Sequence, residues 1–246
     1  MKADTSRQWR LLDLQKLDTR LDQIAHRVKN HPVAAQAAKA EQEAQTAREE
    51  VVIARTALMD IDREITRAEV DVQQVRDRAT RNQARLDAGT GSPKDLQALQ
   101  HELEALSRRQ GELEDIELEI MERAEDLRAV EGRREQQAAQ HDATLAELVA
   151  QRDAELAELN SERERILAER ANISAGVGQD LLDLYLRIRE QRGGIAAAAL
   201  GQRRCGGCGL ELDQSELARI RGAVEDEVLR HDECGRILVR TAESGL

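Results

Sequence analysis

The feature that most constrains this chain is an unbroken heptad repeat in its first half. Small or apolar residues recur there at alternating spacings of four and three, with Asn82 as the one polar exception. The positions are Val33, Ala37, Ala40, Ala44, Ala47, Val51, Ala54, Leu58, Ile61, Ile65, Ala68, Val72, Val75, Ala79, Asn82 and Leu86. A repeat of about 3.5 residues keeps one helix face against a partner helix and imposes a left-handed supercoil. We therefore predict a long coiled coil.

The composition supports this prediction. Aromatic residues make up 1% of the 246 residues, whereas 35% are charged. Globular cores usually bury large aromatic side chains, and a composition rich in Ala, Leu, Glu and Arg is typical of long helices. The formal net charge of −11 argues against a protein that coats nucleic acid with its whole surface.

A glycine-rich break at 88–93 separates two long helical segments. Ser92 is suited to be the N-cap of the second segment, Pro93 its first helical residue and Asp95 its capping-box acid. We predict a tight turn at this point.

The two segments, 4–88 and 93–177, are equally long. This equality favours one antiparallel hairpin, in which Pro32 kinks the first arm without reversing it. The alternative is a full reversal near Pro32, which would leave the end of the second arm unpaired. The predicted fold class is therefore mostly α, with a long kinked antiparallel coiled-coil hairpin.

Two short motifs near the C-terminus contain every cysteine of the chain. Cys205-Gly-Gly-Cys208-Gly and His231-Asp-Glu-Cys234-Gly each place two potential ligands three residues apart, followed directly by Gly. Zn²⁺ prefers four nitrogen or sulfur donors in a tetrahedron, and two short loops commonly supply them. We predict a Zn²⁺ site with the ligands Cys205, Cys208, His231 and Cys234.

Other interpretations of these motifs stay open at this stage. Cys205 and Cys208 could form a redox pair or a disulfide, although a redox CxxC motif usually opens a helix in a βαβ unit. The histidine and cysteine of the second motif could be a surface imidazole and a buried apolar residue. The fourth ligand could instead be Asp232, Glu233 or a water that leaves an open coordination position.

The metal motifs define a small C-terminal domain with minor β structure. We expect a short helix over 214–221 capped by Asp213, a last strand at 237–239, and a strand at 195–200, where composition alone favours helix. A unit of about 50 residues buries little apolar surface, so metal would supply folding energy. The predicted domains are the coiled-coil hairpin at 1–178, a connecting helix at 179–194 and a zinc ribbon at 195–246.

Arginines gather beside the metal motifs in an otherwise acidic chain. Between Leu184 and Arg204 a single acid, Glu190, opposes five arginines. The five are Arg187, Arg189, Arg192, Arg203 and Arg204. They could form a solubilising helix face, or they could contact nucleic-acid phosphates beside a zinc ribbon. The scarcity of aromatics argues against base stacking.

The sequence lacks the usual signs of an active site or a membrane segment. His101-Glu102 has no second histidine at metalloprotease spacing, and we expect a non-enzymatic protein. No apolar run approaches the ~20 residues of a membrane span, and residues 1–10 lack the apolar core of a signal peptide. We expect a cytoplasmic location, where reducing conditions favour metal-bound thiolates over disulfides.

Three further segments complete the pattern. They read Ser92-Pro-Lys-Asp-Leu-Gln-Ala-Leu99, Tyr185-Leu-Arg-Ile-Arg189 and Cys234-Gly-Arg-Ile-Leu-Val239. With the hairpin and the metal motifs, they resemble a bacterial family of coiled-coil hairpin proteins with a C-terminal four-cysteine-type zinc ribbon. The resemblance spans nearly the whole chain and implies zinc ligands at the three cysteines. His231 stands where the family has its third cysteine.

The resemblance implies a regulatory adaptor, in which the ribbon binds nucleic acid and the hairpin engages protein partners. We predict a zinc-binding, non-enzymatic adaptor whose arginine-rich neck contacts nucleic acid. The alternative is a purely protein-binding coiled-coil scaffold with a structural zinc cap, which the overall acidity favours. The sequence does not distinguish RNA from DNA, and it leaves the oligomeric state open because exposed hairpin faces can pair between chains.

Overall fold

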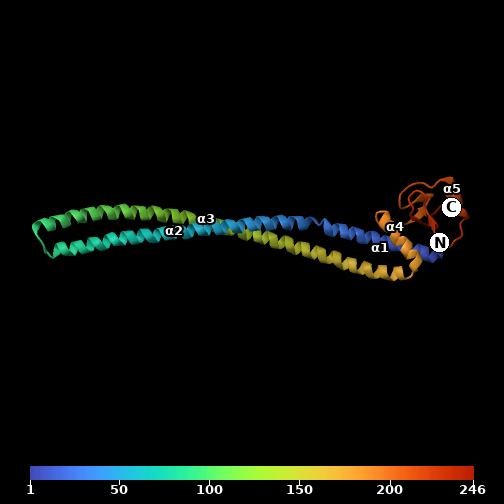
Figure 1. Cartoon of the computed structure of the whole chain (residues 1–246), viewed down its shortest axis with the longest axis horizontal. Helices are drawn as coiled ribbons and strands as arrows, with labels where there is room; N and C mark the ends of the chain where they lie inside the picture. The colour runs from blue at the N-terminus through green and yellow to red at the C-terminus, as the bar shows by residue number, and fades with distance from the viewer. The chain divides into compact units, whose positions relative to one another are not determined.

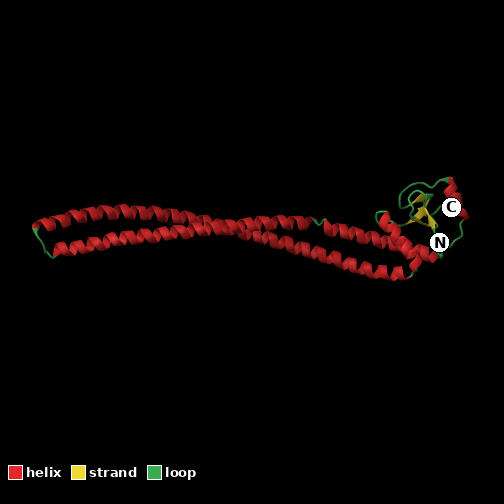
Figure 2. Ribbon diagram, viewed as in Figure 1, coloured by secondary structure: helices red, strands yellow, loops and turns green.

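A computed structural model describes residues 1–246, and most of them are helical (Figures 1 and 2). The helices are α1 (Thr5–Lys29), α2 (Pro32–Asp87), α3 (Pro93–Ala175), α4 (Gln179–Gln191) and α5 (Gln214–Gly222). The strands are β1 (Ala197–Gly201), β2 (Arg204–Cys205), β3 (Leu229–Arg230) and β4 (Ile237–Val239). None of the helices combines the length and the apolar character that crossing a bilayer requires.

The chain forms two compact units. Residues 35–149 make up one, called here the middle unit. Residues 1–34 and 150–246 make up the other, called the terminal unit.

The middle unit is an antiparallel pair of helices. Arg48 of α2 forms an ion pair with Asp142 of α3 at 2.7 Å, and Arg76 forms one with Glu114 at 2.6 Å. As residue numbers rise along α2, those of the partners fall along α3, so the two helices run in opposite directions. The buried positions of α2 follow the predicted heptad register and include Ala37, Ala40, Ala44, Ala47, Val51, Ala54, Ile61, Ala68 and Val72. The coiled-coil hairpin is confirmed.

The turn between α2 and α3 is the predicted one. The Ser92 amide donates to the Asp95 carboxylate at 3.0 Å, and the Asp95 amide donates back to the Ser92 hydroxyl at 3.3 Å. These reciprocal bonds form the capping box expected from the sequence. The hydroxyl and the amide of Ser92 hold the pKa of Asp95 below its usual value.

In the terminal unit, α1 runs antiparallel to the last part of α3. Arg20 forms an ion pair with Glu162 at 2.6 Å, and Asp18 forms one with Arg170, also at 2.6 Å. The first helix therefore pairs with α3 and does not fold back at Pro32, where α2 begins. The alternative of a full reversal near Pro32 is wrong.

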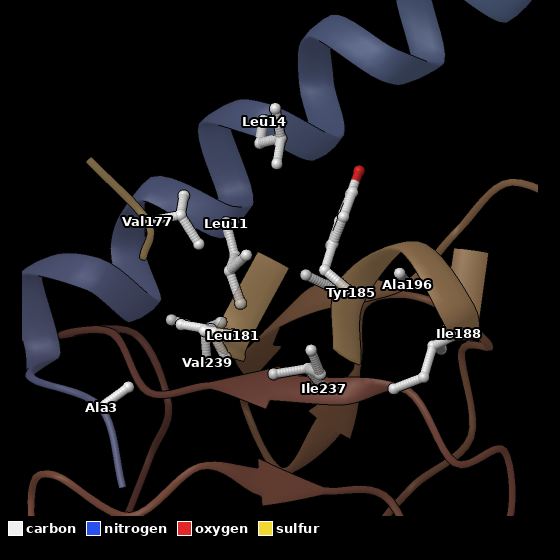
Figure 3. Close-up of a cluster of buried hydrophobic side chains, with 11 residues drawn as sticks. Ala3, Leu11, Leu14, Val177, Leu181, Tyr185, Ile188, Ala196, Ile237 and Val239 are labelled. Carbon is white, nitrogen blue, oxygen red and sulfur yellow. The ribbon is translucent and has the colours of Figure 1, made fainter. Parts of the chain in front are cut away.

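The main core of the terminal unit joins α1, α4 and β4 (Figure 3). It contains Leu11 and Leu14 of α1, Leu181, Tyr185 and Ile188 of α4, and Ile237 and Val239 of β4. The small C-terminal β region thus shares its apolar core with two helices. The predicted domain boundaries at 178 and 194 stay predictions.

The four short strands form one sheet in the order β2-β1-β4-β3. The parallel pair is β1 with β4, and the other two neighbouring pairs are antiparallel. The strand expected near 195–200 is β1, so position in the chain outweighs its helix-favouring composition. Residues 1–3 lie beside the chain just before β3: the Ala3 amide donates to the Asp226 carbonyl at 2.7 Å, and the Val228 amide donates to the Met1 carbonyl at 3.1 Å.

Candidate metal centre

Two loops bring four potential ligand atoms together. One loop follows β2 and the other connects β3 with β4. The sulfurs of Cys205, Cys208 and Cys234 and one ring nitrogen of His231 all lie within 4.8 Å of one another. The two predicted half-motifs therefore meet in space.

The spacing of these atoms fits a tetrahedral zinc ion. Cys205 Sγ and Cys234 Sγ are 3.9 Å apart, and His231 Nδ1 lies 3.4 Å from Cys208 Sγ and 3.1 Å from Cys234 Sγ. A tetrahedron with Zn–S bonds of about 2.3 Å has sulfur–sulfur edges of about 3.8 Å. Three thiols and an imidazole also form a usual donor set for Zn²⁺.

The glycine after each pair of ligands shapes its loop. Gly209 and Gly235 have φ values of 77° and 69°, in the left-handed region that favours glycine. Their amides donate to the carbonyls of Cys205 at 2.8 Å and His231 at 2.7 Å. Each loop thus closes on its first ligand residue.

The surroundings affect two of the thiols in opposite directions. Burial raises the pKa of Cys205 to about 11, although amide donors from Gly207 and Cys208 oppose it. Burial also acts to raise the pKa of Cys234, but hydrogen bonds from Arg236 and His231 outweigh it and lower the pKa to about 6. A cation between the four atoms would favour the thiolate form, because metal binding displaces the thiol proton.

The placement of the neighbouring side chains bears on several interpretations left open by the sequence. His231 is 1% exposed, so its interpretation as a surface imidazole is wrong. Asp232 forms an ion pair with Arg219 at 2.9 Å, and Glu233 is exposed. The histidine, not either carboxylate, faces the sulfurs. All three cysteines are free.

A fifth residue, Glu216, lies beside the candidate ligand His231, and the sequence did not indicate that it belongs to the metal centre. It is 4% exposed and occupies the first turn of α5. One carboxylate oxygen lies 3.7 Å from His231 Nε2, and the other accepts the Asp232 amide at 2.9 Å. The only local signal was its place three residues after the N-cap Asp213, which indicates capping and not a metal site.

The five arginines predicted to bind nucleic acid have different surroundings. Arg189 lies 2.6 Å from Asp22 and 3.4 Å from Asp18. Arg204 is exposed and faces Glu211 at 3.5 Å. The other three are exposed and form no ion pair: Arg187, Arg192 and Arg203.

One of the exposed arginines reaches the second metal loop. A side chain at Gly235 would meet the guanidinium of Arg192 at 3.4 Å and that of Arg230 at 3.1 Å. Arg230 was not among the predicted residues. The glycine leaves room for two guanidinium groups beside the metal ligands.

The matches to known families divide the chain into a hairpin part and a ribbon part. Residues 14–193 match the CT398-like coiled coil hairpin domain, and residues 204–238 match the C4-type zinc ribbon domain. The chain belongs to the CT398-like hairpin family. The resemblance inferred from the sequence is confirmed, including the gathering of His231 with the three cysteines where the ribbon type has four cysteines.

Two relatives and two solved structures are similar over nearly their whole length. The chain is 38% identical to Uncharacterized protein Rv2229c of Mycobacterium tuberculosis over 98% of both chains. It is 28% identical to Uncharacterized protein ML1638 of Mycobacterium leprae over 91% of this chain and 96% of that one. A structure from Mycobacterium smegmatis has 35% identity and a TM-score of 0.84, covering 98% of this chain and 100% of the other. CT398 from Chlamydia trachomatis shares the fold at 16% identity, with a TM-score of 0.66 and coverage of 96% and 98%.

Proposed function

We propose that this protein is a cytoplasmic, non-enzymatic adaptor whose Cys205, Cys208, His231 and Cys234 hold one structural Zn²⁺. The observation that carries the proposal is the meeting of four donor atoms within 4.8 Å. Four protein ligands complete a tetrahedron, which leaves no coordination position for a substrate or an activated water. Zinc in such a site acts on folding, because the ligands converge only in the folded chain.

The metal proposal is tested by elemental analysis of the purified, reduced protein. We expect about one equivalent of zinc and loss of the metal in the His231→Ala variant. The matched control is His101→Ala, because His101 is an exposed histidine of α3. Protein that contains no stoichiometric transition metal would contradict the proposal.

The arginines beside the ribbon support contact with nucleic-acid phosphates as the adaptor's second role. Arg192 and Arg230 place two guanidinium groups at Gly235, and neither forms an ion pair. Paired guanidinium groups match the oxygens of a phosphate in geometry and charge. Arg189 belongs to the same predicted cluster, but its ion pairs with Asp18 and Asp22 also hold α4 to α1.

Binding to duplex DNA and to RNA, measured against salt concentration, tests this role. We expect replacement of the four exposed cluster arginines with glutamine to weaken the salt dependence of binding. The slope of log affinity against log salt concentration should become shallower by about one unit for each phosphate that is no longer neutralised. The changed residues are Arg187, Arg192, Arg203 and Arg204. A matched control changes four exposed, unpaired arginines of the hairpin helices: Arg67, Arg81, Arg108 and Arg133. Absence of salt-dependent binding by the wild type would remove nucleic acid from the proposal.

A purely protein-binding scaffold is the second candidate, and exposed apolar side chains on α2 favour it. Val52, Ile53 and Met59 are 62%, 69% and 57% exposed, and such side chains suit an apolar contact with a partner protein. A pull-down that recovers the same proteins with and without nuclease supports the scaffold. Recovery that depends on nucleic acid counts against it.

A further inference from the structure

The histidine of the metal centre has one ring nitrogen without a partner. Its Nδ1 faces the sulfurs of Cys208 and Cys234. Its Nε2 is buried and forms no hydrogen bond. A buried N–H without an acceptor is costly, so a polar group close to Nε2 matters. The Glu216 carboxylate is such a group, with its Oε2 3.7 Å away.

Glu216 is itself a buried acid with few partners. Its side chain is 3% exposed. Its Oε1 accepts the Asp232 amide at 2.9 Å and lies 3.5 Å from the guanidinium of Arg219, whose side chain is 44% exposed. An ionised carboxylate is expensive to bury unless hydrogen-bond donors surround it. The remaining oxygen, Oε2, faces the histidine.

We infer that Glu216 is a positioning residue of the metal centre, which moves from 3.7 Å into hydrogen-bond distance of His231 Nε2 when a metal is bound, accepts its N–H and thereby directs Nδ1 at the metal. A histidine ligand needs its proton on the nitrogen away from the metal, and an acceptor on that side fixes both the tautomer and the ring orientation. The inference rests on the proposed zinc site and adds to it a residue outside the two ligand motifs.

Charge gives a second reason for a carboxylate at this position. A neutral imidazole in place of a thiolate removes one negative charge from the ligand set. The Glu216 carboxylate places one negative charge directly behind that imidazole. A centre with four cysteines has no Nε2–H that needs an acceptor, and its fourth thiolate already supplies the negative charge. The role of Glu216 therefore depends on the histidine.

The Glu216→Gln variant of the full chain tests the inference. The glutamine carbonyl still accepts the Asp232 amide, but the NH₂ group then faces the histidine N–H, and two donors oppose each other. We expect Zn²⁺ affinity, measured by competition with a chelator, to fall about 10- to 100-fold. The control is Glu211→Gln, which removes the same charge from an exposed residue of the ribbon and should leave the affinity unchanged.

A second background separates positioning from a general effect on folding. In a His231→Cys protein, Glu216→Gln should leave the Zn²⁺ affinity unchanged, because the N–H that needs an acceptor is gone. Co²⁺ absorption reports in each variant whether the ligand set contains the histidine nitrogen or a fourth sulfur, and far-UV circular dichroism reports folding. The inference is also supported if Glu216→Gln does not fold in the protein that keeps His231 but folds normally in the His231→Cys background.

Two results would overturn it while leaving the zinc site intact: wild-type affinity in Glu216→Gln, or an equal loss of affinity or of folding in both backgrounds. A wild-type protein that binds neither Zn²⁺ nor Co²⁺ would instead overturn the proposed zinc site, and this inference with it.

Discussion

At the scale of single residues, one buried carboxylate connects three elements of the terminal unit. Asp18 of α1 is 2% exposed. It accepts hydrogen bonds from Arg170 of α3 at 2.6 Å and from the Tyr185 hydroxyl of α4 at 2.8 Å, and it lies near Arg189. Burial, together with the hydrogen bond to Asp18, raises the pKa of Tyr185. The tyrosine therefore stays a neutral donor at physiological pH.

Asp18→Asn should destabilise this unit strongly. The change leaves Arg170, whose side chain is 25% exposed, without the charge that compensates it, whereas Arg189 keeps its ion pair with Asp22. We expect the free energy of unfolding to fall by about 3–5 kcal/mol, the usual cost of removing one partner from a buried ion pair. Urea denaturation followed by Trp9 fluorescence measures it, because the Trp9 indole donates to the Arg240 carbonyl in the same unit.

The matched control for this prediction is Asp13→Asn on the same helix. Asp13 is exposed and pairs only with Lys16, so its loss should change the free energy of unfolding by less than about 1 kcal/mol. Equal denaturation midpoints for the two variants would show that the buried pair contributes no more than an exposed one.

At the residue scale, local motifs could be predicted from the sequence, and contacts between residues far apart in the chain could not. The cysteines and His231 could be predicted as one site because ligand spacing within a loop is local. Glu216 could not, because its relation to His231 depends on how α5 packs against the second loop. Arg189 was predicted as a phosphate ligand from its neighbours in the chain. Its partner Asp18 lies more than a hundred residues away, and nothing in the local sequence reveals such a pair.

At the scale of elements, the alanine-rich part of α2 sets how closely the helices of the middle unit approach. Ala44 is fully buried in the seam. We expect Ala44→Leu to lower the stability of the middle unit by about 1–3 kcal/mol, because a packed interface has no room for the larger side chain. Thermal unfolding monitored by far-UV circular dichroism measures the effect.

Ala38→Leu provides the matched control on the same helix. Ala38 points to solvent, so the same enlargement there meets no partner and should leave the transition temperature almost unchanged. A larger loss from Ala38→Leu than from Ala44→Leu would contradict the assigned seam.

Elements with local signals could be predicted well, and elements with distant partners could not. The capping box of Ser92 and Asp95 joins residues three apart, so its chemistry is visible in the sequence. The heptad repeat of α2 is long enough that its register can be predicted without knowing the partner helix. In contrast, residues 1–3 find their partners at 226–228, and a pairing so short and so distant leaves no periodic pattern.

At the scale of the whole molecule, metal binding should stabilise the terminal unit selectively. Zinc contributes about 10–16 kcal/mol to small zinc-dependent folds. Its ligand loops adjoin β2, β3 and β4, and β4 carries part of the core formed with α1 and α4. The helices of the middle unit have their own buried seam.

We therefore expect a chelator to act on the two units differently. Hydrogen exchange measured by mass spectrometry should show loss of protection across 197–239 and in residues 1–3, while the buried seam of α2 keeps its protection. The His231→Ala variant should reproduce this pattern without the chelator. A β region that stays protected after complete metal removal would contradict the stabilising role of zinc.

The shared core of α1, α4 and β4 also has a consequence for protein synthesis. Leu11 and Leu14 leave the ribosome long before Tyr185 and Ile237, the side chains that bury them. At about 5–20 residues per second, the delay is on the order of 10 to 45 seconds. Throughout that interval the apolar face of the nascent helix is uncovered, which makes it a natural substrate for chaperones that bind chains during translation.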